Sequence, residues 1–315
     1  MKVLVVDPRA ERYERGLREA FPALDVTGAT SFPEGSLAET NVLVTMGVPL
    51  PGIHFTSELA ARMPALEWVQ CLLSGPEIVL AALAERDDVL LTTAAGVHGP
   101  QMAEMALVQM LVLNRDLRRI LRNQDARTWE RVPQRVLEGK VAGILGMGAV
   151  GTHLAAVLAG LGMRVHSFSR QPRPVPGVEE AFLRDELAHD APNLDFLVVL
   201  LPSGPDTAHF VDAAVLASLK ETAYVIVLGR GGVVDEEALA GALSSGSIAG
   251  AGLDVFETEP LPADSPLWAL DNAIVTPHAG GTSDRYPEQA LALVVPNLRA
   301  FLDGRHDDMV NVVRR

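Results

Sequence analysis

The chain has a single cysteine, no long hydrophobic run and no N-terminal leader pattern. One cysteine, Cys71, excludes an intramolecular disulfide, which fits the reducing environment of the cytoplasm. No apolar stretch approaches the roughly 18 residues that suggest a membrane-spanning helix. The N-terminus has one basic residue before a very short apolar run, so we expect a first strand there rather than a signal peptide. The sequence therefore predicts a cytoplasmic protein that does not use the membrane.

Basic residues are also in short supply. Lys and Arg number 26 against 40 Asp and Glu, which gives a formal net charge of −14. This excess disfavours nucleic acids and anionic membranes as partners, and an anionic substrate must be held by local positive groups. Apolar residues make up 48% of the chain, enough for folded cores. Because single cores rarely exceed about 250–300 residues, the length predicts two domains.

The most informative stretch is the glycine-rich segment Gly146-Met-Gly-Ala-Val-Gly151. It follows the apolar run 141–145, which is typical of a buried strand, and it precedes a helix-forming run. Strand, turn and helix are the context in which G-x-G-x-x-G spacing indicates dinucleotide binding. Gly146 would permit the tight turn, Gly148 the approach of a pyrophosphate, and Gly151 close packing of helix on strand. The helix N-terminus would offer N–H groups and its dipole to the phosphates.

Short apolar runs alternate with helical patterns along the whole chain. The runs expected to form strands are 3–6, 42–46, 66–72, 89–92, 141–145, 163–168, 194–201, 223–228, 248–255 and 273–276. Helices are expected at 9–20, 57–63, 100–118, 215–219, 235–244 and 284–302. Such alternation indicates parallel α/β units. We expect an α/β protein of two Rossmann-like parallel-sheet domains, one flavodoxin-like and one dinucleotide-binding, with a cleft between them.

The two expected domains differ in that only the second contains the glycine fingerprint. The helix 284–302 comes too late to belong to the sheet just completed, so we expect it to return to the first domain. The expected domains are residues 1–99 plus 283–315 and residues 100–282. Trp129 lies in a polar segment that we expect to cover a domain junction, as a packing residue there or at a dimer contact.

The segment after the strand 163–168 decides which dinucleotide is preferred. An Asp or Glu there would accept a hydrogen bond from the ribose 2′-OH, but the segment reads Ser169-Arg-Gln-Pro-Arg173. Arg170 and Arg173 can meet a 2′-phosphate, to which Ser169 can donate. A charge-assisted Arg–phosphate contact contributes roughly 1.5–3 kcal/mol, so we expect about 10- to 100-fold preference for NADP(H), with NAD(H) still possible. The residues alone leave open that both arginines are solvated surface groups.

Arg230, Glu259 and His278 each follow a later strand of the second domain. Ligands of open α/β sheets bind beyond the carboxyl ends of the strands, so these three side chains can meet at one edge. The guanidinium would pair with a substrate carboxylate and polarise its keto oxygen. The imidazolium would donate a proton to that oxygen as hydride reaches the carbon, while the carboxylate favours the protonated ring. Each residue alone could equally be a surface side chain; their shared placement favours an active site.

Several stretches together resemble the D-isomer-specific 2-hydroxyacid dehydrogenases. They are residues 143–151, 229–239, 252–261 and 265–278, joined by 95–104 and 68–75. The resemblance covers nearly the whole chain, and its motifs come in the family's order. The segment from Ser169 to Arg173 is similar to the NADPH-using glyoxylate/hydroxypyruvate reductases of that family.

The resemblance implies an enzyme that transfers hydride from NADPH to a small 2-oxo acid, with Arg230, Glu259 and His278 catalytic and His278 the proton donor. It implies that the discontinuous domain binds substrate, that Asp254 lies near the nicotinamide carboxamide, and that a homodimer forms through the second domain. The expected substrate-binding residues are Leu73, Ser74, Gly75, Arg230 and His278. The expected cofactor contacts are Gly146, Met147, Gly148, Ala149, Val150, Ser169, Arg170, Arg173, Leu201, Pro202, Thr207, Leu228, Gly229, Asp254, His278 and Gly280. No metal is expected.

The chain departs from the family's pattern in two places. Val227 stands where Asn is frequent, which removes a possible polar contact near the catalytic Arg. The substrate loop 71–77 lacks the Gly-x-Asp of many members, which weakens its assignment. We expect Cys71 to be a packed residue, Glu77 a surface acid, and His98 a structural residue more than a substrate-cleft one.

Two other functions stay open. The first is a non-catalytic NAD(P)-binding scaffold or co-regulator, against which the three catalytic residue types argue. The second is a phosphoglycerate-type dehydrogenase, against which the first domain argues, because it shows no obvious basic cluster for a substrate phosphate.

Overall fold

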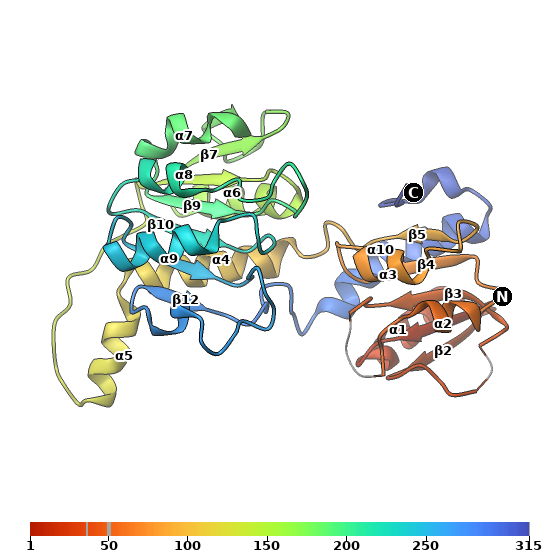
Figure 1. Cartoon of the computed structure of the whole chain (residues 1–315). Helices are drawn as coiled ribbons and strands as arrows, with labels where there is room; N and C mark the ends of the chain where they lie inside the picture. The colour runs from red at the N-terminus through yellow and green to blue at the C-terminus, as the bar shows by residue number, and fades with distance from the viewer. Residues whose placement is uncertain (36, 49–51, 315) are drawn as a thin grey trace. The chain divides into compact units, whose positions relative to one another are not determined.

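The computed structural model describes residues 1–35, 37–48 and 52–314 (Figure 1). The chain divides into two compact units, unit 1 with residues Met1–Val97 and Ser283–Arg315, and unit 2 with residues His98–Thr282. Each unit is built on one sheet of parallel strands with helices packed against it. The predicted class, two parallel-sheet α/β domains, is therefore confirmed.

Unit 1 has a five-stranded sheet in the order β2-β1-β3-β4-β5. The strands are β1 Lys2–Val6, β2 Asp25–Ala29, β3 Thr40–Thr45, β4 Trp68–Cys71 and β5 Leu90–Thr92, and the helices are α1 Ala10–Ala20, α2 Ser57–Ala61, α3 Glu77–Ala82 and α10 Tyr286–Leu302. Because side chains alternate along a strand, Val3 and Val5 pack with α1 and α10. Leu4 and Val6 face the opposite layer. Both faces of the central strand are therefore buried.

A buried amide network ties α10 to this sheet. Asn297 Nδ2 donates to Gln70 Oε1 at 3.3 Å and to the Val310 carbonyl at 3.1 Å, and Asn297 Oδ1 accepts from the Val310 N–H at 2.9 Å. Gln70 Oε1 also accepts from Thr92 Oγ1 at 2.8 Å, and that hydroxyl accepts from Trp68 Nε1 at 2.9 Å. The last helix packs against the first sheet, and satisfied buried polar groups specify where it docks.

Unit 2 has a seven-stranded parallel sheet in the order β12-β11-β10-β9-β6-β7-β8. The strands are β6 Val141–Leu145, β7 Arg164–Ser169, β8 Glu180–Leu183, β9 Phe196–Val199, β10 Tyr224–Val227, β11 Gly250–Leu253 and β12 Ala273–Val275. The helices are α4 Gly99–Asn114, α5 Leu117–Asp125, α6 Ala149–Gly160, α7 Leu187–Asp190, α8 Ala213–Ser218 and α9 Glu236–Ser245. Strand order reverses between β6 and β9, the switch point at which open α/β sheets bind ligands.

The segment after α4 differs from the prediction. The single helix expected at 100–118 ends at Asn114, because Asp116 adopts a left-handed conformation with φ 47°, and α5 begins at Leu117. Asp reaches this conformation more readily than most residues. Of the described residues of α5 none is buried. Trp129, expected to pack at a domain junction or a dimer contact, is 94% exposed in the single chain. Figure 1 shows α5 and the following segment reaching away from the sheet of unit 2.

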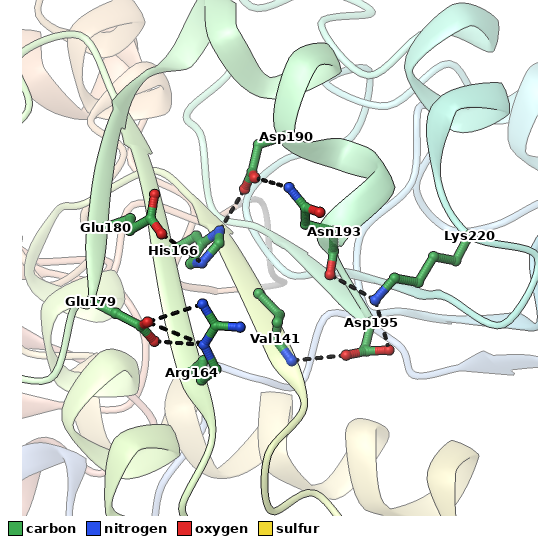
Figure 2. Close-up of polar contacts among 9 residues, drawn as sticks. All are labelled: Val141, Arg164, His166, Glu179, Glu180, Asp190, Asn193, Asp195 and Lys220. Carbon is green, nitrogen blue, oxygen red and sulfur yellow. Dashed lines mark hydrogen bonds and ion pairs between the residues drawn. The ribbon is translucent and has the colours of Figure 1, made fainter.

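Polar side chains close the amino-terminal edge of the seven-stranded sheet (Figure 2). His166 Nδ1 lies 2.6 Å from Asp190 Oδ2, and Asn193 Nδ2 donates to Asp190 Oδ1 at 2.7 Å. Asp195 accepts the backbone N–H at the start of β6 at 2.9 Å, and Lys220 Nζ donates to it at 3.1 Å. The side chains of His166 and Asp190 are only 4% and 5% exposed. These side chains therefore bond to one another and to nearby backbone groups.

Among the described helices of the chain, none is long and apolar enough to cross a bilayer.

Candidate active site

The glycine loop after β6 has the geometry of a phosphate cradle. Gly146 has φ 111°, a conformation that favours glycine. At Gly151 a Cβ would lie 2.2 Å from the Gly146 carbonyl oxygen, so α6 can pack this closely only through glycine. Gly148 precedes the first residue of α6, and no described atom lies within 4 Å of where its Cβ would stand. Open space beside the unpaired N–H groups of a helix start fits a dinucleotide pyrophosphate.

The end of β7 carries the residues expected to read the ribose. Ser169 is the last residue of the strand, and Arg170 and Arg173 follow it on exposed backbone. Arg173 Nη2 lies 3.5 Å from Oγ1 of Thr152, in the first turn of α6. Arg170 Nη2 donates to Asp206 Oδ2, in the loop after β9. The sequence prediction missed Asp206, because nothing local marks a residue that reaches β7 from a different loop.

The three expected catalytic residues follow neighbouring strands. Arg230 comes after β10, Glu259 after β11 and His278 after β12, and these strands are adjacent in the sheet. Parallel neighbours lie about 4.8 Å apart, so the carboxyl ends of β10 and β12 are separated by roughly 10 Å. That span suits a small acid held between a guanidinium and an imidazole.

The imidazole of His278 is bonded to a carboxylate through one of its two ring nitrogens. Its Nδ1 lies 2.7 Å from Glu259 Oε2, and Glu259 Oε1 accepts the N–H of Phe256 at 3.1 Å. His278 has φ 51°, and its own N–H donates to the Asp254 carbonyl at 2.8 Å. The side chain is 47% exposed. With Nδ1–H directed at the carboxylate, Nε2 points away from it and can exchange a proton with a substrate.

Asp254 orders the loop that carries this histidine. It is 1% exposed and directly follows β11. Its Oδ1 accepts from Thr276 Oγ1 and from the Ala279 N–H at 2.9 Å, and its Oδ2 accepts from the Gly280 N–H at 2.8 Å. Gln109 of α4 donates to Thr276 Oγ1 at 3.1 Å. Thr276 and Gln109 were missed by the sequence analysis, although Thr276 adjoins the Pro-His motif.

Glycines on both sides of Arg230 let its loop pack closely against the loops after β9 and β11. A Cβ on Gly231 would lie 1.8 Å from the Phe256 carbonyl oxygen, and one on Gly229 would lie 2.4 Å from the Leu201 oxygen. Arg230 is half-buried, and its Nη1 donates to the Gly229 carbonyl at 2.9 Å. Phe256 also supplies the N–H that holds Glu259. The loops carrying the guanidinium and the carboxylate are therefore packed backbone to backbone.

His98 lies close enough to Arg230 for their charges to interact. Burial, and then the positive charge of Arg230, lower the pKa of His98 from 6.5 to about 4. The residue precedes α4, and a Cβ on Gly281 would lie 3.1 Å from His98 Cδ2. The ring is therefore neutral at neutral pH and packs against the loop that follows His278.

Other residues singled out from the sequence lie in the loop after β9, at buried positions, or in the loop after β4 of unit 1. Thr207 is 2% exposed and its Oγ1 donates to the Pro202 carbonyl at 2.7 Å, so it shapes the loop after β9. Leu201, Leu228 and Val227 are buried. Leu73, Ser74 and Gly75 follow β4 of unit 1, where the Leu73 N–H lies 3.5 Å from Cys71 Sγ. Cys71 is buried, as expected, and burial raises its pKa to about 11.

Comparison with known proteins identifies the family. The model of the D-isomer specific 2-hydroxyacid dehydrogenase NAD binding domain matches residues 107–280. A structure of a D-isomer specific 2-hydroxyacid dehydrogenase family protein from Aeromonas salmonicida is 31% identical with a TM-score of 0.89, over 99% of this chain and 98% of that one. An NADPH-dependent glyoxylate/hydroxypyruvate reductase from Sinorhizobium meliloti, solved with NADP and sulfate, is 30% identical with a TM-score of 0.81, over 99% and 98%.

A longer relative is also similar. The D-3-phosphoglycerate dehydrogenase of Mycobacterium leprae is 34% identical over 263 residues, which are 81% of this chain and 49% of that protein. This chain thus spans about half the length of that relative. Because the family model covers more than half the chain, the chain belongs to the D-isomer specific 2-hydroxyacid dehydrogenases. It is an NAD(P)-dependent oxidoreductase, as the motifs predicted.

Proposed function

We propose that the protein reduces a small 2-oxo acid, of the size of glyoxylate or hydroxypyruvate, to the D-2-hydroxy acid, with NADPH as the preferred hydride donor. The observation that carries this proposal is the His278–Glu259 pair at 2.7 Å, beyond β12 and two strands from Arg230. A half-exposed imidazole and a guanidinium carried by strands whose ends lie roughly 10 Å apart suit an acid whose keto group adjoins its carboxylate.

In this mechanism Arg230 pairs with the substrate carboxylate and polarises the keto oxygen. His278 Nε2 donates a proton to that oxygen, which becomes the hydroxyl, and Glu259 stabilises the ring while it carries the charge. A dinucleotide held by the β6–α6 loop would supply the hydride for the new C–H bond. In the oxidative direction neutral His278 accepts the hydroxyl proton. Asp254 keeps the His278 loop in place through its bonds to Ala279 and Gly280.

The preference for NADPH is supported by charge at the end of β7. Gly146, Gly148 and the first turn of α6 would hold the pyrophosphate, and Ser169, Arg170 and Arg173 would meet the 2′-phosphate. The similar reductase from Sinorhizobium meliloti is NADPH-dependent. The loop Leu73–Gly75 of unit 1 would supply N–H groups to the substrate carboxylate, a role that rests on the family resemblance.

A phosphoglycerate-type activity is the second candidate, favoured by the similarity to the Mycobacterium leprae enzyme. The decisive measurement is kcat/KM over glyoxylate, hydroxypyruvate, pyruvate, longer 2-oxo acids and 3-phosphohydroxypyruvate, each with NADPH and NADH, followed at 340 nm. We expect the highest values with glyoxylate or hydroxypyruvate and NADPH. A best value with 3-phosphohydroxypyruvate would support the second candidate. Dinucleotide binding without turnover on any acid would support a non-catalytic scaffold.

We also propose a homodimer formed through unit 2. Its support is the apolar surface of α5 and the segment after it, where Leu117, Leu121 and Trp129 are 36%, 48% and 94% exposed. Exposed apolar side chains gathered on one extension are typical of an interface between chains. Light scattering should give twice the 33.6 kDa chain mass, and Trp129→Ser should shift the equilibrium toward monomer. A monomer mass at micromolar concentration would contradict the proposal.

A further inference from the structure

Unit 2 lacks an acid at the end of β7, yet the fold brings one there from another strand. Asp206 lies in the loop after β9, and its Oδ2 accepts from Arg170 Nη2. The same oxygen accepts from Arg184 Nη2 at 3.2 Å. Arg170 is the first residue after β7 and the expected reader of a 2′-phosphate. Its guanidinium is thus already paired with a carboxylate.

Asp206 is held in place independently of Arg170. Its loop is a compact turn in which the N–H groups of Thr207 and Ala208 both donate to the Gly204 carbonyl at 3.0 Å. Arg184 is 16% exposed and its guanidinium carbon lies 5.3 Å from the ring centroid of Phe210. This largely buried arginine holds the Asp206 carboxylate in place. Arg170, whose side chain is 65% exposed, is the member of the trio that can change partners.

We propose that Asp206 is a specificity-determining residue, which competes with the 2′-phosphate for Arg170 and so limits the preference for NADPH over NADH. The inference rests on the proposed function, since it concerns how that function selects its dinucleotide. It concerns the binding of the adenosine half, and Asp206 has no part in the chemical step.

The competition follows from charge. To bind a 2′-phosphate, Arg170 must leave Asp206, and an exposed ion pair of this kind is worth up to about fivefold in an equilibrium. The phosphate also approaches a carboxylate of like sign, which adds a further repulsion that salt screens. With NADH no phosphate arrives and the pair stays intact. Removing the carboxylate should therefore favour only the phosphorylated nucleotide.

The test uses Asp206→Asn, with Asp185→Asn as its matched control. Asp185 is 82% exposed and lies 3.6 Å from Arg184, so its substitution removes the same charge beside the same arginine without touching Arg170. Calorimetry with 2′,5′-ADP and 5′-AMP measures binding at the adenosine end without turnover, and kcat/KM with NADPH and NADH follows the effect into the reaction. Thermal melting reports whether each variant is folded.

We expect Asp206→Asn to tighten 2′,5′-ADP about three- to tenfold and to raise the NADPH/NADH ratio of kcat/KM by the same factor. Binding of 5′-AMP should change less than twofold, as should every value for Asp185→Asn. In an Arg170→Gln background the effect of Asp206→Asn on 2′,5′-ADP should fall below twofold.

An unchanged or weakened 2′,5′-ADP affinity in Asp206→Asn would overturn the inference. So would an equal gain in Asp185→Asn, or an equal gain in the Arg170→Gln background, because either would show a general charge effect instead of competition for Arg170. If Asp206→Asn does not fold, Asp206→Ser serves the same comparison. Failure of the wild-type protein to bind either nucleotide would remove both the inference and the proposed function, whereas failure of the variant effect alone removes only the inference.

Discussion

Two histidine–carboxylate pairs of nearly equal length belong to opposite halves of the same sheet. His278 Nδ1 lies 2.7 Å from Glu259 beyond the carboxyl end of β12, and His166 Nδ1 lies 2.6 Å from Asp190 in the amino half of β7. Their exposure differs greatly. The first pair has side chains 47% and 35% exposed, the second 4% and 5%.

The length of a histidine–carboxylate contact therefore does not distinguish a candidate catalytic pair from a buried one. Asp190 is also bonded to Asn193, and the pair is enclosed between β7, β8 and α7 (Figure 2). The loop that carries His278 continues into Gly280 and Gly281, and the His278 side chain is half exposed. At the amino end of the sheet the His166–Asp190 pair is enclosed by the protein, while at the carboxyl end the His278 imidazole is half exposed.

The largest effect is expected for His278→Ala. Loss of a positioned proton donor should lower kcat by about 10²- to 10⁴-fold, because general acid catalysis contributes that much. The free energy of unfolding should stay close to wild type, since the side chain is half exposed. Steady-state kinetics and urea unfolding measure both. A kcat/KM near wild type would contradict the assigned role, and Arg230→Ala should show the same loss of turnover.

His166→Ala should lower stability and leave kcat nearly unchanged, the opposite of His278→Ala. Removing His166 leaves the buried Asp190 carboxylate without one of its partners, and loss of a partner from a buried charge costs about 3–5 kcal/mol when nothing else compensates. Because Asp190 keeps its bond to Asn193, we expect less than that, roughly 2–3 kcal/mol. Urea unfolding measures the loss, and kcat should change less than about threefold at a temperature where the variant is folded. A tenfold fall in kcat with unchanged stability would reverse the comparison.

Arg170→Asp tests the end of β7, where the 2′-phosphate of the cofactor would bind. Loss of a charge-assisted contact to the 2′-phosphate, worth roughly 1.5–3 kcal/mol, should shift the NADPH/NADH ratio of kcat/KM toward NADH by about 10- to 100-fold. Turnover at saturating cofactor should change little. Arg164→Asp, at the amino end of β7, is the matched control. An unchanged cofactor ratio would show that Arg170 does not read the phosphate.

A third histidine, His98, has its pKa lowered by burial and by the nearby charge of Arg230. Its pKa of about 4 lies below the ordinary 6.5, so the unfolded chain binds a proton more readily between those values. Stability from this residue should therefore fall as pH decreases from about 6.5 to 4, by up to about 3 kcal/mol. His98→Asn should lack this pH dependence, so the difference in unfolding free energy between wild type and variant should change by that amount across the window. Parallel stability–pH curves would rule the assignment out.

Much of the fold could be predicted because buried parallel strands are short apolar runs. Two strands were missed, β2 Asp25–Ala29 and β8 Glu180–Leu183. Both lie at sheet edges, and each has exposed positions, so their sequences are not continuously apolar. The break at Asp116 was also missed, since neither Gly nor Pro marks it.

The positions of the candidate site residues could be predicted where each lies within a few residues of a strand end, as Arg230, His278 and the glycines of the β6–α6 loop do. Such positions follow from parallel topology alone. Contacts between loops do not follow from it. The pairing of Arg170 with Asp206 joins residues 36 positions apart, and the approach of Gly231 to Phe256 depends on how two neighbouring turns meet. Both contacts become visible only in the three-dimensional structure.

The docking of α10 has a consequence for synthesis of the chain. The core of unit 1 includes Tyr286, Leu298 and Phe301 alongside residues from its first strands, so it stays incomplete until those late residues have emerged from the ribosome. Unit 2, by contrast, is continuous in sequence and can close earlier. Because domains generally fold as units during translation, the first strands to be made should be among the last to reach their native packing. They would be the segments most exposed to chaperones and proteases on the nascent chain.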